Sequence, residues 1–399
     1  MPITLDTRDA GFETAFATLL AAKRENAADV DVAVAAIIDN VASRGDAALV
    51  EYTNRFDRVE LTPARLRLTK GEIAAGADAA PTETVDALRL AAERIESFHR
   101  RQLPMMIDYV DDAGVRLGLR WRPVAAAGLY VPGGTAAYPS SVLMNAIPAK
   151  VAGVERLVMT VPAPDGVLNP LVLAAARLVG IDEIYRIGGA QAVAALAYGT
   201  ATIKAVDKIV GPGNAYVAAA KRRVFGRVGI DMIAGPSEIL VVADRHNDPA
   251  WIAADLLSQA EHDAAAQAIL VTDSSEFAAA VEAAAARHLE HLPRADIARA
   301  SWQANSAILL VADWNEAAPL IDRIAPEHLE LAIDDPDALA ARVHHAGAIF
   351  LGRYTPEAIG DYVAGPNRLD ALAPAAIRLA EAEGLDAHAL SLALRLSRR

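Results

Sequence analysis

From Val124 onward, short apolar runs alternate with segments of helical periodicity, and this alternation constrains the fold more than any other sequence feature. Segments 171–179 and 251–261, for example, repeat apolar residues at helical spacing between two such runs. This alternation is typical of βαβ units, whose strands form mostly parallel sheets covered by helices on both faces. The sequence therefore predicts an α/β fold. The expected strands are 157–161, 183–187, 208–210, 239–242, 268–271, 307–311 and 348–351.

The residues before this region are predicted to be mainly helical. Segment 30–41 carries a mixed apolar face, and segment 83–101 has helical spacing and ends before Pro104. Segment 115–121 alternates apolar residues with Gly and Arg, which suits a strand. The chain has 399 residues, enough for two or three domains. Helices of the N-terminal part can pack against the sheets without forming a separate domain.

Composition narrows the partners and the metal chemistry. The formal net charge is −13 and Lys and Arg are dispersed among acidic residues, which argues against nucleic acid or an anionic membrane as the main partner. The chain has no cysteine, so a transition metal must be held by His, Asp, Glu or an amide oxygen. No stretch resembles a signal peptide or has the length of a membrane span, so we expect a cytoplasmic protein.

Four glycine-rich turns follow predicted strands. They are residues 128–135, 187–191, 210–214 and 234–238. Glycine allows positive φ and close approach of a ligand, and a helix N-terminus after the turn presents free N–H groups to phosphate. Any one turn is explained equally well by the glycine and proline that ordinarily end a strand. Four together favour a phosphate-bearing cofactor, but none matches G-x-G-x-x-G, so the residues alone leave its identity open.

Two pairs of residues are candidates for metal binding and proton transfer. Gln259 and His262 are three apart on a predicted helix and share a face, although a polar helix end with a surface histidine explains them as well. Glu327 and His328 place a carboxylate beside an imidazole, the natural base for an alcohol proton. In a regular strand these neighbours would face opposite sides. Both therefore serve one site only if the backbone after Pro326 is irregular.

Two further acidic segments lie near the C-terminus. Asp361 follows a glycine in an apolar setting and is either a ligand or a helix cap. Segment 381–388 carries two acids and His388 on a predicted amphipathic helix, where a solvated helix face is the simpler explanation. The residues alone therefore predict an α/β enzyme with metal binding as an open alternative.

Taken together and in this order, the motifs resemble the histidinol dehydrogenase family. Any one motif is weak, but the ordered set is specific and runs over nearly the whole chain. The matching segments are 128–135, 187–192, 206–214, 231–238, 255–262, 326–329, 360–367 and 383–388. The resemblance implies two-step, NAD-dependent oxidation of L-histidinol to L-histidine through an enzyme-held aldehyde, at the end of histidine biosynthesis.

The resemblance also implies roles for individual residues. His328 matches the general base and Glu327 its acid/base partner. Zinc, one ion per site, would be held by Gln259, His262 and Asp361 of one subunit and by His388 of the other. The residues that match NAD contacts are Tyr130, Gln191 and Asn214. The residues that match substrate contacts are Ser237, Gln259, His262, His328, Asp361, Glu383 and His388.

The family fold implies two incomplete Rossmann-like domains with parallel sheets in an intertwined homodimer that shares its active sites. On this chain we expect an N-terminal helical arm at 1–26 and a first Rossmann-like domain at 27–129 plus 238–367, which carries the metal and base residues. The NAD-binding turns would form a second such domain at 130–237. The C-terminal tail, 368–399, would cross to the partner subunit.

One block of the family pattern is missing after Asn367. The family continues there with a substrate-contacting histidine and a Leu-Pro-Thr segment, whereas Arg368 follows at once here. Either the block is deleted or it has been left out of the sequence; a normal Cα–Cα spacing of about 3.8 Å between Asn367 and Arg368 would favour deletion. Two alternatives therefore stay open: a zinc- and NAD-dependent dehydrogenase for another amino alcohol or diol, and a catalytically impaired paralogue.

Overall fold

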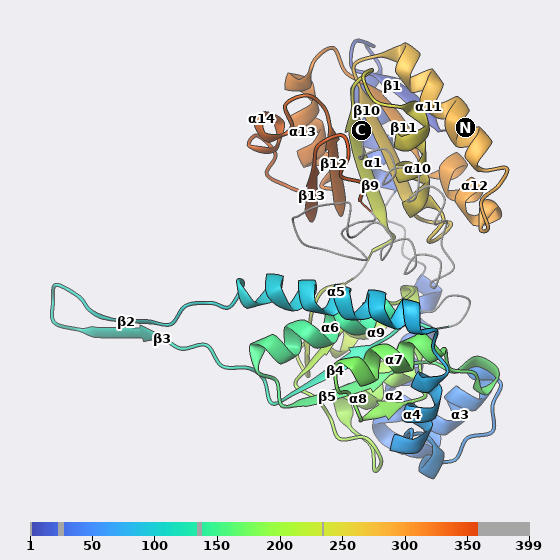
Figure 1. Cartoon of the computed structure of the whole chain (residues 1–399), viewed down its shortest axis with the longest axis vertical. Helices are drawn as coiled ribbons and strands as arrows, with labels where there is room; N and C mark the ends of the chain where they lie inside the picture. The colour runs from blue at the N-terminus through green and yellow to red at the C-terminus, as the bar shows by residue number, and fades with distance from the viewer. Residues whose placement is uncertain (1, 23–27, 134–137, 234, 358–399) are drawn as a thin grey trace. The chain divides into compact units, whose positions relative to one another are not determined.

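The computed structural model describes residues 2–22, 28–133, 138–233 and 235–357. The chain forms two compact units. One unit comprises Met1–Glu25 together with Pro236–Arg399, and the other comprises Asn26–Gly235. We call the first the discontinuous unit and the second the central unit, and we describe each by itself (Figure 1).

The central unit is built on a five-stranded parallel sheet with the order β6-β5-β4-β7-β8. Its strands are β4 (Ala126–Tyr130), β5 (Arg156–Thr160), β6 (Ile184–Tyr185), β7 (Lys208–Val210) and β8 (Gly229–Ile230). The middle strand β4 is buried along its whole length. Because β5 and β7 flank β4 on opposite sides, the chain reverses its direction of strand addition between β4 and β7.

Helices cover this sheet, and the alanine-rich ones are buried almost completely. In α8 (Gly189–Tyr198) every residue from Ala190 to Ala197 is buried, because α8 packs against α2 (Ala28–Arg44) and α9 (Ala215–Val224). The other helices are α3 (Asp46–Asp57), α4 (Lys70–Asp78), α5 (Thr82–Arg100), α6 (Pro139–Ala152) and α7 (Pro170–Leu178), with short 3-10 turns at Pro63–Arg65 and Pro164–Gly166. Helices α4, α5, α6 and α7 pack on one another, and α2, α8 and α9 share one apolar core.

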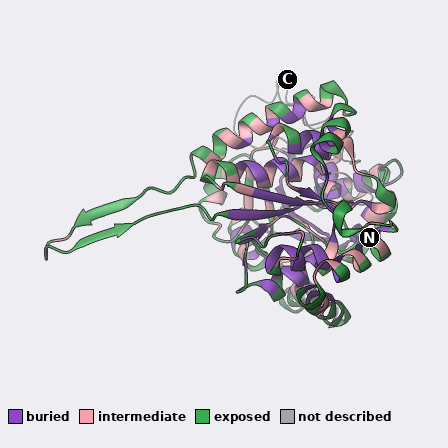
Figure 2. Cartoon of the chain, turned by 90° about the horizontal axis from the view of Figure 1, so that it is seen from below, coloured by how far each residue is buried: buried purple, intermediate pink, exposed green. Residues whose placement is uncertain are grey.

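A two-stranded ribbon leaves the body of the central unit. Strand β2 (Ile107–Val110) pairs antiparallel with β3 (Arg116–Leu119), and every residue of both strands is exposed. Figure 2 shows the ribbon as an extended exposed arm. The register places Ile107 opposite Leu119 and Tyr109 opposite Leu117. One face of the ribbon is therefore entirely apolar, since alternate residues point to the same side.

The discontinuous unit is built on a six-stranded parallel sheet with the order β1-β11-β10-β9-β12-β13. Its strands are β1 (Ile3–Asp6), β9 (Glu238–Ala243), β10 (Gln267–Thr272), β11 (Ala307–Leu310), β12 (His328–Ala332) and β13 (Ala348–Leu351). Strands β9 to β12 are almost wholly buried, which fits interior positions that are apolar except for Glu330 of β12.

Two separate apolar cores cover the two faces of this sheet. On one face lie α10 (Pro249–Ala260), α11 (Ser275–His288) and α12 (Ala295–Ala304). On the other lie α1 (Phe12–Ala22), α13 (Trp314–Ile324) and α14 (Pro336–Ala340). Along β12, Leu329 and Leu331 belong to the second core and Ala332 to the first, so His328 and Glu330 point towards α10.

The α/β fold with two parallel sheets is confirmed, and an observed strand overlaps each of the seven expected ranges. The expected assignment of 27–129 to the domain that carries the base residues is wrong. Helices α2 and α5 from this stretch pack on α8, α9 and α6 instead, so it belongs to the central unit. The expected arm at 1–26 contributes β1 to the edge of the discontinuous unit's sheet, where it pairs with β11. The tail at 368–399 lies outside the described residues.

No helix among the described residues is long and apolar enough to span a membrane.

Candidate functional site

The Glu327–His328 pair lies where the chain enters β12. Helix α13 ends at Ala325 in the left-handed region, with φ 50°, and β12 begins only at His328. Glu327 precedes the strand, so strand alternation does not separate the two side chains. Both reach the main chain of Glu238: His328 Nδ1 lies 3.1 Å from its carbonyl oxygen, and Glu327 Oε2 accepts its N–H at 3.4 Å. The irregular backbone that a shared site requires is present.

The hydrogen bond at Nδ1 fixes which nitrogen of His328 can act as a base. A carbonyl oxygen only accepts, so Nδ1 must carry the proton. The lone pair of the neutral ring is therefore on Nε2. Glu357 Oε1 lies 3.7 Å from Nε2, on a side chain that is only 1% exposed.

Gln259 lies in the last turn of α10, which packs against β9, and His262 follows just after the helix ends. Gln259 is buried, and the His262 main-chain N–H donates to the Gln259 carbonyl oxygen at 3.1 Å. Desolvation lowers the pKa of His262 to about 4, and the positive charges of Arg294 and His328 act in the same direction. The His262 ring is therefore neutral at physiological pH, which is the form that binds a metal.

The remaining predicted residues of this site are placed only in part. Ser237 immediately precedes β9, and its carbonyl oxygen accepts the N–H of Gln267 at 2.9 Å. Asp361, Glu383 and His388 lie outside the described residues. Within the described ranges, no group of three or more His, Cys, Asp or Glu side chains could hold a metal ion. Gln259 and His262 alone would supply two ligands and leave the others to segments that the structure does not describe.

In the central unit, the predicted cofactor residues gather at the carboxyl ends of β4, β6 and β7. The buried Tyr130 hydroxyl accepts the N–H of Gly189 at 3.0 Å, at the start of α8, and burial raises the pKa of Tyr130 to about 12, so the phenol stays neutral. Gln191 lies in the first turn of α8, and its buried Oε1 has no hydrogen-bond partner among the described residues. Asn214 caps α9, accepting N–H groups of Tyr216 and Val217.

Gly211 closes the turn between β7 and α9 where no larger residue fits. Its φ is +122°, and a Cβ would lie 2.1 Å from the Tyr130 carbonyl oxygen. The Gly211 N–H donates to Asp231 Oδ2 at 2.8 Å, and its carbonyl oxygen accepts from Lys221 Nζ at 2.9 Å. Lys221 and Asp231 are themselves ion-paired. Gly211 is thus held by hydrogen bonds at both its N–H and its carbonyl oxygen.

Sequence reasoning missed Lys221 and Asp231 as parts of this turn. Lys221 is 2% exposed and stands on the apolar face of α9 with Val217 and Val224. The signal that could have revealed it is a lysine at helical spacing within an apolar face, because such a lysine needs a buried partner of opposite charge. Burying a charge is costly unless an opposite charge compensates it, and Asp231 does so here.

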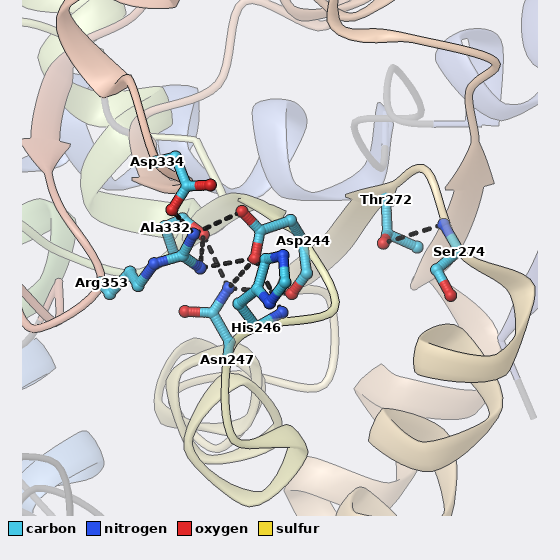
Figure 3. A network of polar contacts seen from close by, with 8 residues as sticks. All are labelled: Asp244, His246, Asn247, Thr272, Ser274, Ala332, Asp334 and Arg353. Carbon is cyan, nitrogen blue, oxygen red and sulfur yellow. Dashed lines mark hydrogen bonds and ion pairs between the residues drawn. The ribbon is translucent and has the colours of Figure 1, made fainter.

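The two units place their candidate residues at opposite ends of their strands. In the central unit they follow the usual rule for open α/β sheets, at the carboxyl ends near the reversal point between β4 and β7. In the discontinuous unit they lie at the amino ends of β9 and β12. The carboxyl ends there are filled by Arg353, which is ion-paired with Asp244 and Asp334, while Asn247 Nδ2 donates to the Ala332 carbonyl oxygen at 2.7 Å (Figure 3).

Comparisons with known proteins agree with these motifs. The family model described as Histidinol dehydrogenase matches residues 20–369. A histidinol dehydrogenase of Rhodospirillum rubrum is 61% identical over 431 aligned positions, covering 100% of this chain and 99% of the relative. One of Ruegeria pomeroyi is 60% identical over 430 positions, with the same coverage. The crystal structure of histidinol dehydrogenase from Elizabethkingia anophelis superposes with a TM-score of 0.86 at 33% identity, covering 100% of this chain and 99% of that one.

The alignment lengths bear on the block that is missing from the family pattern. An alignment of 431 positions contains at least 32 that have no counterpart among the 399 residues of this chain. The family match ends at residue 369, two residues beyond Asn367. The position of the missing block, and the spacing between Asn367 and Arg368, lie outside the described residues and stay predictions.

Proposed function

This chain belongs to the histidinol dehydrogenase family, and from that premise we propose that it oxidises L-histidinol to L-histidine in the last steps of histidine biosynthesis. The observation that carries the proposal is 61% identity over the full length to a histidinol dehydrogenase. The reaction takes a primary alcohol and one water to a carboxylate, and it delivers two hydrides to two NAD molecules.

His328 is the base that removes the alcohol proton. Its Nδ1 is engaged by the Glu238 carbonyl oxygen, so Nε2 receives the proton. Glu238 thus orients the ring as well as fixing its tautomer, because β12 pairs with β9 along this edge.

Glu327 is the group that activates water for the second step. Its side chain is exposed, and its Oε2 accepts the Glu238 N–H, which keeps the carboxylate on the same side of the strand entrance as His328. A carboxylate in this position accepts a proton from water as the water attacks the aldehyde carbon.

Zinc fits the donor set, and we propose that Gln259, His262 and Asp361 hold it together with the partner subunit's His388. The observation that supports the fit is the neutral His262 ring, whose pKa of about 4 leaves a lone pair free for a metal near pH 7. Bound zinc would orient the substrate's nitrogen and hydroxyl groups relative to His328. A chain without cysteine offers only such nitrogen and oxygen ligands.

NAD fits the turns of the central unit, where we propose that Tyr130, Gln191 and Asn214 contact it. The buried Gln191 Oε1, which no described donor reaches, and the N-termini of α8 and α9 support this placement. Bound NAD would accept the hydride from the substrate carbon. Tyr130 holds the start of α8, and the Lys221–Asp231 pair holds the turn at Gly211, so both turns would be fixed before NAD binds.

We further propose that the protein is a homodimer with shared active sites. The ribbon of β2 and β3 supports this, because its apolar face is exposed and a two-stranded ribbon is marginally stable alone. A second copy would cover this face. The cytoplasmic location expected from the sequence also stays a prediction.

One observation favours a second candidate function. This chain lacks 32 or more of the aligned positions. If these positions follow Asn367, the chain also lacks a substrate contact of the family, and it would then be a catalytically impaired paralogue. A relative that oxidises another amino alcohol or a diol is the remaining alternative.

The deciding experiment counts NADH formed per L-histidinol, with and without a chelator. Two NADH per substrate, abolished by chelation and restored by zinc, is the expected result. One NADH per substrate, or turnover only with other alcohols, would point to the related dehydrogenase. No turnover by a protein that still retains zinc would identify the impaired paralogue.

A further inference from the structure

Three carboxyl groups are buried in a row next to His328. They belong to Glu357, which lies beyond β13, to Glu330 of β12 and to Asp255 of α10, and their exposed fractions are 1%, 1% and 8%. Three buried carboxylates cannot all remain charged without compensating partners, because desolvation and mutual repulsion both oppose ionisation. At least one of them must be neutral.

The neutral group is Glu330. Its side chain is hydrogen-bonded to that of Asp255, and two carboxyl groups can form such a bond only when one of them carries a proton. Burial raises the pKa of Glu330 well above its usual value, and the negative charges of Asp255 and Glu357 add to the effect. Burial likewise raises the pKa of Asp255 to about 7.

This carboxyl pair fixes the segment that carries Glu357. The Glu330 carboxyl accepts the main-chain N–H of Glu357. Ser258 Oγ, which donates to the Asp255 carbonyl oxygen at 2.7 Å, lies 3.4 Å from Glu357 Oε2. Four residues earlier, Arg353 is tied to Asp244 and Asp334, as Figure 3 shows. The segment from Arg353 to Glu357 is therefore anchored at both ends, which fixes the position of the Glu357 carboxylate.

We propose that Glu357 is a positioning residue for His328: it faces Nε2 and stabilises the imidazolium that forms when His328 takes the alcohol proton. Asp255 and Glu330 act one step further away, by holding Glu357 in place. The inference rests on the proposed role of His328 as a base. It explains why a carboxylate lies 3.7 Å from the nitrogen that the main chain leaves free.

Titratable side chains other than Glu357 also lie near His328. In the described part they are Glu327, its neighbour in sequence, Glu330 on the same strand face, Asp255 next to Glu330, and His262, which follows the end of α10. Of these, Glu330 is neutral by the argument above. Replacing Glu357 by Gln removes the negative charge of the carboxylate whose Oε1 lies 3.7 Å from His328 Nε2.

The first test compares steady-state kinetics of Glu357→Gln with the wild type. We expect kcat to fall by about 10- to 100-fold while KM for L-histidinol and for NAD changes by less than about two-fold, as for a loss of general-base efficiency. The acid limb of the kcat–pH profile should move to lower pH, because the imidazolium loses its counter-charge. A lower kcat with an unmoved acid limb would mean a purely structural role and overturn the proposal.

Two further variants test the anchor and the specificity of the effect. Glu330→Gln keeps an acceptor for the Glu357 N–H and a donor for Asp255, whereas Glu330→Leu removes both, so the Leu variant should lose clearly more kcat. Glu316→Gln makes the same chemical change in the same unit, where the carboxylate accepts from Thr7 and Ala312 after β11, and it should behave as wild type. Equal losses in all of these variants would contradict the proposal.

A measurement that needs no turnover separates this inference from the proposed function. The C–H resonances of ¹³C-labelled histidine, assigned with a His328→Gln variant, report the titration midpoint of the His328 ring in the full-length protein. We expect the midpoint to fall by about one pH unit or more in Glu357→Gln. An unchanged midpoint overturns the inference, whereas a shifted midpoint in a protein that does not oxidise L-histidinol overturns only the proposed function.

Discussion

At the scale of single residues, hydrogen bonds to the main chain determine which nitrogen of His328 can act as the base. The Glu238 carbonyl oxygen accepts a hydrogen bond from Nδ1 of His328, and the Glu238 N–H donates one to Glu327 Oε2. Both predicted residues therefore face one main-chain position. The sequence alone correctly posed the condition that the backbone must be irregular before His328. It did not indicate Glu357 or Glu330, because a buried acid is recognised only from partners that are distant in sequence.

The shared proton of Asp255 and Glu330 predicts a pH dependence of stability. The pair binds at least one proton in the folded protein near pH 6, where the unfolded side chains bind almost none, so the free energy of unfolding contributed by the pair falls as pH rises. Each bound proton contributes a slope of about 1.4 kcal/mol per pH unit. Wild type should therefore lose stability relative to Glu330→Gln between pH 5 and 7.

Urea unfolding at several pH values checks this difference, since the effects of unchanged groups cancel between the two proteins. His262 is the group that most needs cancelling. Its lowered pKa makes the folded protein less stable as pH falls from about 6.5 towards 4, which is the opposite direction. Parallel stability curves for wild type and Glu330→Gln would show that no proton is shared.

At the scale of elements, the sequence predicted the strands that local periodicity marks. It did not predict the contacts that depend on how the strands pair. Strand β7 was predicted with its bounds as observed, and β9 and β10 were predicted to within a residue at each end, because each is an apolar run between turn residues. The edge strand β1 and the two-residue β8 have no such signal. The reach of β12 towards α10, which brings His328 near His262, depends on the pairing of β12 with β9 and not on any local pattern.

The turn after β7 gives a prediction about close backbone approach. Gly211→Ala should lower the free energy of unfolding by about 3 kcal/mol or more and weaken NAD binding, because its Cβ would meet the Tyr130 carbonyl oxygen at 2.1 Å. Gly226→Ala is the matched control. It also has a positive φ, of +98°, but nothing lies within 4 Å of its Cβ, so it should show only the smaller cost of backbone strain.

Thermal unfolding and isothermal titration with NAD measure both effects. If the two variants were equally destabilised, backbone strain alone would explain the glycine at 211. If Gly211→Ala bound NAD as wild type does, this turn would not belong to the cofactor site.

At the scale of the whole molecule, the family was predictable from the ordered motifs, whereas the division into units was not. The stretch 27–129 was assigned to the wrong unit because the apolar pattern of a helix does not indicate which sheet it packs against. Its helices α2 and α5 cover the sheet of the central unit. The roles of Asp361, Glu383 and His388 stay predictions, since these residues lie outside the described part of the chain.

The apolar face of the β2–β3 ribbon gives a prediction about assembly. Replacing the opposed residues Tyr109 and Leu117 by Ser should shift the protein from dimer to monomer, with association weakened by about 100-fold or more, because each buried apolar side chain contributes about 1.5–3 kcal/mol. Sedimentation velocity over a concentration series measures this shift. Val167→Ser, which alters another exposed apolar side chain of the central unit, should leave the dimer intact. A wild-type protein that sediments as a monomer at every concentration would refute the homodimer.

The placement of β1 has a consequence for the order of folding during synthesis. The central unit is one continuous stretch and can complete its core while the ribosome is still translating the later residues. Strand β1 is made first, yet β11, the strand with which it pairs, lies some three hundred residues downstream. Strand β1 therefore cannot pair until β11 has been translated, and the sheet of the discontinuous unit is completed only after the whole central unit has been made.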